Sequence, residues 1–148
     1  MKKFKFKLQP LVNYKETIQR MQKEELKRAQ QALQELQNEE NRLLQATLDN
    51  ERSLEEALAK NENVAQALIE HDAYFRFLRD AIKEVREKIK RAEEVVIRCQ
   101  EQLIITMKEL KTYEKLRKEQ YQEYLKEVKT EEEKEMDDIV SFKIVSGS

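Results

Sequence analysis

Between Phe75 and Tyr124, apolar residues recur at alternating steps of three and four positions, and no other feature constrains the fold of this chain as strongly. This spacing places them on one stripe of an α-helix and is typical of a coiled coil. The intervening residues are mostly Glu, Lys, Arg and Gln, so the stripe suits one or two partner helices rather than a globular core. The steps fall on Phe75, Leu78, Ile82, Val85, Ile89, Ala92, Val96, Cys99, Leu103, Thr106, Leu110, Tyr113, Arg117, Gln120 and Tyr124.

The composition supports long helices. The chain has one Gly and one Pro in 148 residues, and 40% of its residues are charged. A compact α/β or all-β domain of this length uses many more Gly and Pro residues in its turns, which argues against those folds. A disordered chain is also rich in charge, but it lacks a sustained heptad repeat. The sequence therefore predicts an all-α protein without a deep catalytic cleft.

The charge pattern restricts the partners. Lys and Arg (29) almost balance Asp and Glu (30), and the two signs alternate, so no broad field favours nucleic acid or an acidic substrate. The basic cluster Lys2, Lys3, Lys5 and Lys7 is more typical of a solvated terminus than of a contact with an anionic membrane. No apolar run has the length of a signal peptide core or a membrane span, and a single cysteine cannot form an internal disulfide. We therefore expect a cytoplasmic protein.

A second, less regular stripe predicts a first helix from about Pro10 to about Lys60, with the proline in the first turn, where its missing N–H is not needed. Three later positions of this stripe, Glu40, Thr47 and Asn50, are polar. They either fix the register at a cost in stability or mark a partly solvated seam, and both interpretations stay open. The stripe begins with Leu11, Tyr14, Ile18, Gln22 and Leu26, the last two reached by a stutter of two steps of four.

Residues 61–73 lose the repeat and contain Asn61, Asn63 and Asp72, which favour turns and helix caps. We predict a turn at about 61–73, a second helix at about 74–139 and a flexible tail at 140–148, within a single coiled-coil domain over residues 1–148. The two stripes can then bury each other in a long two-helix antiparallel coiled-coil hairpin. One continuous helix in a parallel dimer is the competing arrangement.

The hairpin prediction sets a register in which facing residue numbers sum to about 133. It places Leu36 near Val96 and Ile18 near Lys115. Residues from about 126 to 139 then extend past the first helix without a partner in the chain, and we expect a partner molecule there.

Few residues could carry chemistry. His71 is the only histidine and is expected in the solvated turn, which excludes a metal site with two histidines and gives a catalytic triad no support. Cys99 lies on the apolar stripe, where a cysteine usually acts as a small apolar side chain. Gly147 is the only glycine, so no phosphate-binding loop is present. The sequence predicts no enzyme activity, no metal and no cofactor.

Aromatic residues gather at the two expected ends of the hairpin. Near the turn, Tyr74 and Phe77 fall off the heptad step beside Phe75 and Leu78. At the other end, the candidates are Phe4, Phe6, Tyr121 and Tyr124. Each cluster either seals an end of the hairpin or offers aromatic anchors to a partner.

Two stretches of the sequence resemble signatures of the flagellar export protein family FliJ. Residues 4–11 read Phe-Lys-Phe-Lys-Leu-Gln-Pro-Leu, which resembles the opening of that family. Residues 110–116 read Leu-Lys-Thr-Tyr-Glu-Lys-Leu, and with Glu-Met-Asp-Asp at 135–138 they resemble its second signature. The length, the composition and the two-helix plan agree with the family over nearly the whole chain.

The resemblance implies a non-enzymatic, stalk-like component of the flagellar type III export apparatus, cytoplasmic and peripherally associated with the cell membrane at the flagellar base. It implies that the chain binds and stimulates the export ATPase hexamer and contacts the export-gate membrane protein and export chaperones, with no nucleic acid and no small-molecule substrate. The residues implied in gate binding are Tyr74 and Leu78. Those implied in ATPase binding are Phe4, Phe6, Leu8, Leu11, Lys111, Glu114, Lys115, Leu116, Met136, Asp137 and Asp138.

Two alternative functions stay open beside the stalk. A general cytosolic coiled-coil chaperone would bind unfolded client proteins through its aromatic ends. A parallel dimeric scaffold would have twice the mass of the chain. The hairpin stalk is instead expected to be a monomer on its own.

Overall fold

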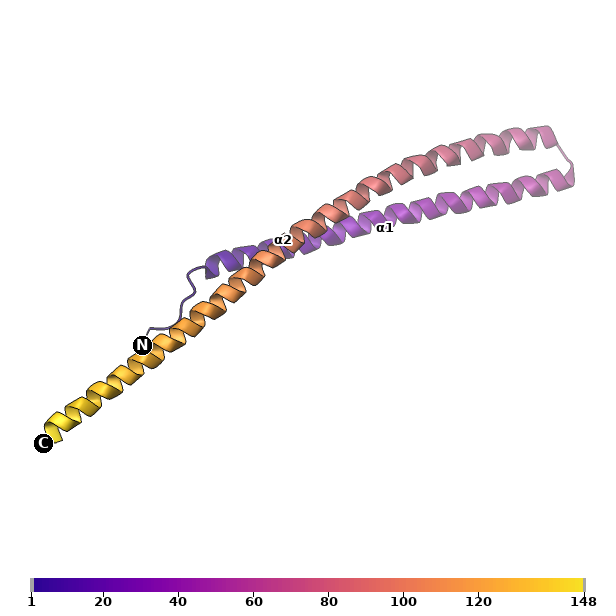
Figure 1. The fold of residues 1–148 in the computed structure, drawn as a ribbon. Helices are drawn as coiled ribbons and strands as arrows, with labels where there is room; N and C mark the ends of the chain where they lie inside the picture. The colour runs from indigo at the N-terminus through magenta and orange to yellow at the C-terminus, as the bar shows by residue number, and fades with distance from the viewer. Residues whose placement is uncertain (1, 148) are drawn as a thin grey trace. The chain divides into compact units, whose positions relative to one another are not determined.

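In the computed structural model, which describes residues 2–147, two α-helices account for most of the chain. Helix α1 spans Gln9–Lys60 and helix α2 spans Val64–Gly147 (Figure 1). The described residues contain no strand, so the all-α prediction is confirmed. The contacts divide the chain into two units, which are described separately. We call residues Met21–Leu103 the turn unit, and the residues up to Arg20 with those from Ile104 onward the terminal unit.

In the turn unit, residues 21–60 of α1 and 64–103 of α2 run in opposite directions and bury a narrow seam between them. Its buried apolar side chains are Leu78, Val85 and Val96, which all belong to the stripe predicted for the second helix. Most other stripe positions are half-buried, as expected when only two helices share a seam. The two-helix antiparallel hairpin predicted from the sequence is therefore confirmed.

In the terminal unit, the beginning of α1 and the residues before it lie along α2. Its buried side chains are Phe6 and Thr106.

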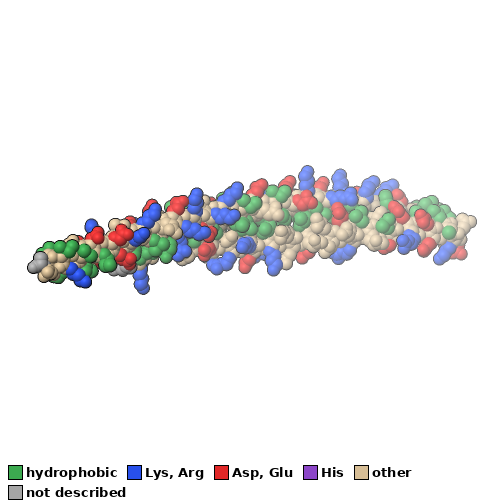
Figure 2. All heavy atoms as spheres, turned by 60° about the horizontal axis from the view of Figure 1, so that its bottom comes forward, with side chains coloured by type: hydrophobic (Ala, Val, Ile, Leu, Met, Phe, Trp, Pro, Cys, Tyr) green, Lys and Arg blue, Asp and Glu red, His purple; other side chains and the backbone are tan. Residues whose placement is uncertain are grey.

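Basic and acidic side chains alternate over the visible surface of the molecule (Figure 2), in agreement with the balanced charge of the sequence.

The turn is shorter than predicted. Helix α1 ends at Lys60, as expected, but α2 already begins at Val64, so residues 64–73 are helical and the predicted turn at 61–73 is wrong over most of its length. Asn61 and Asn63 have φ values of 53° and 45°, a left-handed conformation that asparagine tolerates better than most residues. Two asparagines therefore reverse the chain without glycine.

The predicted register is also wrong. Lys15 contacts Glu109 and Glu40 contacts Arg86, pairs whose numbers sum to 124 and 126 instead of 133. The shorter, earlier turn accounts for this difference. Because the shift is close to one heptad, it brings the same stripe of α2 to the seam, so the apolar repeat alone does not distinguish the two registers.

Two seam positions differ from the predicted stripe. Tyr14 is 63% exposed, and the half-buried Lys15 occupies the seam in its place. Similarly, Leu116 is half-buried while Arg117 is exposed. In both cases the three-four repeat admits either neighbour, and packing selects the one whose Cβ points at the opposite helix.

The C-terminal part of α2 was predicted as a helix to about 139 followed by a flexible tail at 140–148. This prediction is wrong for residues 140–147, because α2 continues to Gly147, while Ser148 lies outside the described residues. Glycine and proline are the residues that weaken a helix most. Neither occurs in α2 before Gly147, so no residue of this kind stops the helix earlier. All residues from 129 to 147 are exposed.

Asn50 lies in the seam of the turn unit and is 9% exposed. Its Nδ2 donates a hydrogen bond of 3.1 Å to the backbone carbonyl oxygen of His71 on the facing helix. A buried polar side chain that is paired across a coiled coil fixes the alignment of the helices at a cost in stability. The pairing favours the first of the two interpretations of the polar seam positions.

Replacing Asn50 by leucine is expected to raise the free energy of unfolding by about 1 kcal/mol, because the desolvation cost of the amide disappears while apolar burial increases. The variant should also lose the single alignment of its two helices. Helices that are free to pair in other ways also pair between copies, so light scattering should show a mixture of masses. Thr130→Leu, at an exposed position of α2, serves as the control for added apolar surface. A destabilised variant with a single mass would contradict this role of Asn50.

Candidate functional site

Residues 2–8, which we call the leader, have no regular structure and lie along α2 in the terminal unit (Figure 1). Phe6 anchors the leader, being 7% exposed. The ring of Phe4 packs edge-on against Tyr121, with the ring centroids 5.2 Å apart, and the hydroxyl of Tyr124 donates a hydrogen bond of 2.7 Å to the carbonyl oxygen of Lys2. These contacts bring the N-terminal signature of the sequence onto the second helix.

A groove of about 370 Å³ runs between the start of the chain and α2 in the terminal unit. It joins residues from both family signatures, because Phe6 lies on one side while Lys111 and Glu114 lie on the other. A second groove of about 260 Å³ beside it is lined by Phe4 and again by Glu114. The structure therefore brings together four of the residues that the family resemblance assigned to ATPase binding.

The remaining residues of that set are placed less uniformly. Leu8, Leu11 and Leu116 are half-buried, while Lys115 is exposed. Met136, Asp137 and Asp138 do not line either groove, and they lie on the fully exposed C-terminal part of α2. The set therefore consists of one group around the leader and a second group farther along α2.

Sequence reasoning missed several residues of the first groove. Gln9, Val12 and Arg117 also line it, and Arg117 had been assigned to the buried stripe. The signal that could have found Arg117 is its charge, because an arginine at a heptad position of a thin coiled coil usually reaches solvent.

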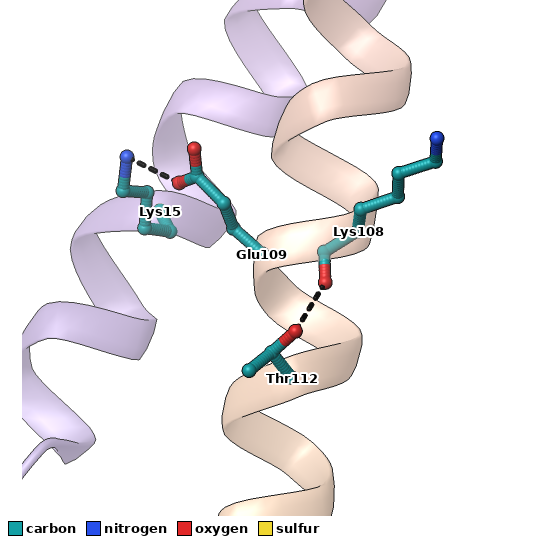
Figure 3. A network of polar contacts seen from close by, with 4 residues as sticks. All are labelled: Lys15, Lys108, Glu109 and Thr112. Atoms are coloured by element: carbon teal, nitrogen blue, oxygen red, sulfur yellow. Dashed lines mark hydrogen bonds and ion pairs between the residues drawn. The ribbon is translucent and has the colours of Figure 1, made fainter.

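Lys15 and Glu109 form an ion pair across the two helices of the terminal unit (Figure 3). The Nζ of Lys15 lies 2.6 Å from Oε2 of Glu109. The hydrogen bond to Glu109 raises the pKa of Lys15 above its ordinary value of 10.5, and the negative charge of the carboxylate acts in the same direction, while desolvation opposes both. The pair links α1 to α2 close to the first groove.

This ion pair predicts a loss of stability at alkaline pH. Because the folded chain raises the pKa of Lys15, the contribution is complete below the ordinary lysine value and disappears as the pH rises through the higher folded value. We expect the difference in urea midpoint between the wild type and Lys15→Met to be constant from about pH 7 to about pH 10 and to shrink above it. The control is Lys108→Met, since the Lys108 side chain points away from the pair (Figure 3). A difference that stays constant beyond pH 11 would contradict the assignment.

The gate-binding candidates lie in the turn unit and differ in accessibility. Leu78 is the most buried large side chain, at 2% exposure, so it packs against α1 and offers no surface to a partner. Tyr74 is 46% exposed, and its ring stacks on that of Phe77 with centroids 6.3 Å apart. Of the two candidates, only Tyr74 presents a free face.

The residues considered for chemistry have structural surroundings. His71 was predicted in the turn, and this prediction is wrong, because His71 lies in α2. Its Nδ1 lies 2.7 Å from the carbonyl oxygen of Ala67, and its Nε2 lies 3.3 Å from Oγ of Ser53. Cys99 is a half-buried free thiol. Residues 2–147 contain no group of three or more His, Cys, Asp or Glu side chains placed to hold a metal ion. Over the same range, neither helix has an apolar stretch sufficient to cross a membrane.

These features define a class of protein, a helical hairpin whose grooves and exposed side chains are suited to contacts with other proteins. A family model described as flagellar FliJ protein matches residues 4–146, nearly the whole chain. The chain therefore belongs to the FliJ family and is a component of the flagellar export apparatus. The components of this family are non-enzymatic. No curated protein and no solved structure matches the chain.

Proposed function

We propose that the chain is a stalk-like subunit that binds the flagellar export ATPase ring and stimulates its activity. The observation that carries the proposal is the groove in which Phe6 lies opposite Lys111 and Glu114. Two sequence signatures more than 100 residues apart meet there, and the groove offers a partner an apolar surface with charges of both signs. Such a surface can recognise a specific partner, since apolar contacts provide affinity and charges provide orientation.

The C-terminal part of α2 supports a second contact with the ATPase. Met136, Ile139 and Val140 are at least half exposed, and Asp137 and Asp138 lie among them. Exposed apolar residues at this density mark an interaction surface. Stimulation requires that the ring binds the stalk more tightly in one of its states than in another, because equal binding to all states shifts no equilibrium.

The gate and the chaperones complete the proposal. Tyr74 is the gate-facing side chain, and Leu78 supports it from the seam, because a buried leucine holds this part of α2 against α1. The chain acts as a monomer in the cytoplasm, and contact with the gate protein places it at the membrane near the flagellar base. Export chaperones bind other exposed parts of the same hairpin.

Binding to the purified export ATPase tests the first groove. Lys111→Glu is expected to weaken binding at least tenfold in a titration followed by fluorescence anisotropy, because it places a second carboxylate beside Glu114. Lys108→Glu carries the same charge change one turn away and does not line the groove, so it should bind like the wild type. Equal binding by both variants would exclude this groove as the contact. Binding of unfolded client chains, with no ATPase binding, would support the general chaperone instead.

A further inference from the structure

The leader presents apolar and basic side chains in strict alternation. Phe4 and Leu8 are half-buried and Phe6 is buried, whereas the lysines between them are exposed. Such alternation is typical of an extended chain, in which successive side chains point in opposite directions. The leader therefore lays its apolar side chains on α2 and leaves its positive charges exposed. The lysines of the leader are Lys2, Lys3, Lys5 and Lys7.

Beside the leader, α2 carries a row of carboxylates. Glu123, Glu127 and Glu131 are exposed and follow one another at steps of four residues, which places them on one face of the helix. They line a third groove, of about 930 Å³, together with the four lysines of the leader. No other charged side chain of residues 2–147 lines this groove. The groove therefore has a basic side, formed by the leader, and an acidic side, formed by α2.

The surroundings of the leader stay acidic when its other neighbours are included. The leader contributes side chains to all three grooves of the terminal unit. Apart from its own lysines, the charged residues that line these grooves are five carboxylates and three basic side chains, which leaves two net negative charges. They are Glu16, Glu114, Glu123, Glu127 and Glu131, with Lys111, Arg117 and Lys118.

The attraction between leader and α2 acts across the groove instead of through close pairs. No lysine of the leader forms an ion pair with another residue in the range 2–147. Separated charges at a surface attract each other weakly, and salt screens this attraction strongly. Several such attractions in one groove add up to a contact that responds to ionic strength.

We propose that the leader is a strap whose closure on α2 is controlled by these charges. Burial of Phe6, the ring contact of Phe4 and the hydrogen bond from Tyr124 determine where the leader lies. The four lysines and the three carboxylates of the third groove shift the balance between the closed leader and the detached one. Salt opens the strap because it screens the charges while the apolar contacts remain.

Closure of the strap also completes the two smaller grooves. Phe6 lines the first groove and Phe4 lines the second, so a detached leader leaves each groove without an aromatic side chain. A partner that needs these side chains binds only the closed state, and its apparent affinity falls with the fraction of closed chains. This consequence rests on the proposed ATPase contact, whereas the strap itself does not depend on it.

Trypsin cleavage of the full chain after Lys5 and Lys7 tests the proposal, because its rate follows the population of detached leader. Each rate is divided by that of a synthetic peptide of residues 2–12, which contains the same lysines without α2 and corrects for the effect of salt on trypsin. For the wild type, we expect this ratio to rise about fivefold between about 20 mM and about 500 mM NaCl. Over this range the Debye length falls from roughly 20 Å to roughly 4 Å.

Neutralising the acidic side of the third groove should have the same effect as salt. The ratio should be about five times that of the wild type already at about 20 mM NaCl, and it should change little at higher salt. The positions are exposed, so the helix content in circular dichroism should not change. The variant combines Glu123→Gln, Glu127→Gln and Glu131→Gln.

The matched control loses three carboxylates at exposed positions of α2 outside the three grooves, through Glu119→Gln, Glu132→Gln and Glu133→Gln. It should behave like the wild type at both salt concentrations. A wild-type ratio that does not change with salt, or equal ratios in the two triple variants, would overturn the strap. Cleavage that follows the expectation while the purified export ATPase does not bind the chain would support the strap and contradict the proposed function.

Discussion

Replacing Leu78 by alanine is expected to lower the free energy of unfolding of the turn unit by about 3 kcal/mol, the largest effect of any single apolar truncation in this seam. Leu78 is 2% exposed, and no other large side chain among residues 2–147 is buried as completely. Truncation removes three carbon atoms from the interface and leaves a cavity that two rigid helices cannot close.

The narrowness of the seam makes the loss serious for this unit. Apart from Leu78, only Val85 and Val96 are buried apolar residues of the turn unit, so few other contacts can compensate. A loss of about 3 kcal/mol is a large fraction of the stability of an ordinary domain. Urea unfolding followed by far-UV circular dichroism measures the effect.

Ile69→Ala is the matched control, since Ile69 lies in the same part of α2 and is 66% exposed. Its cost should stay below about 0.5 kcal/mol, because a solvent-facing substitution of a helix residue by alanine removes little buried area. Similar losses in both variants would mean that Leu78 is not the principal packing residue of this unit.

Phe6→Ala is expected to detach the leader from α2 while both helices stay folded. Phe6 is the only buried side chain of residues 2–8, and the leader has few other contacts with α2, chiefly the Phe4 ring and the hydrogen bond from Tyr124. Losing a buried phenylalanine costs about 3–5 kcal/mol in a core, more than these remaining contacts can supply. The effect is therefore local, with no change in helix content.

Limited trypsin digestion reports on the leader directly, because Lys5 and Lys7 flank Phe6. Cleavage at these lysines requires local opening, so its rate follows the population of the detached state. We expect Phe6→Ala to raise the rate at least tenfold, and Tyr124→Phe, which removes only the hydroxyl donor, to raise it a few-fold. Phe142→Ala, at a residue 72% exposed, is the control that should leave the rate unchanged. Equal rates in wild type and Phe6→Ala would show that the leader is not anchored by this ring.

The sequence predicted the helices and their seam because both depend on local periodicity. The three-four repeat identified Leu78, Val85 and Val96 as core, and Pro10 marked the start of α1 within one residue. The FliJ resemblance was carried by short signatures, and the family model confirms it over residues 4–146. Features encoded in neighbouring residues were therefore accessible without a structure.

The register of the two helices and the grooves on their surface could not be predicted from the sequence in the same way. A heptad repeat looks the same after a shift of seven residues, so only the exact turn, set by Asn61 and Asn63, fixes which residues face each other. The first groove depends on how Phe6 meets α2, and the exposure of Phe75 depends on how α1 and α2 pack against each other. These are properties of packing between distant segments. The assignment of eleven residues, the first Phe4 and the last Asp138, to ATPase binding stays a prediction. The assignment of the chain to a single domain also stays a prediction.

The ATPase rate of the purified flagellar export ATPase, measured with increasing amounts of this chain, tests the proposed function most directly. The proposal predicts a rate that rises and saturates as the chain is added, and a loss of this rise in Lys111→Glu but not in Lys108→Glu. An unchanged rate in the presence of saturating wild-type chain, under conditions where the ATPase forms its hexamer, would contradict the stalk function.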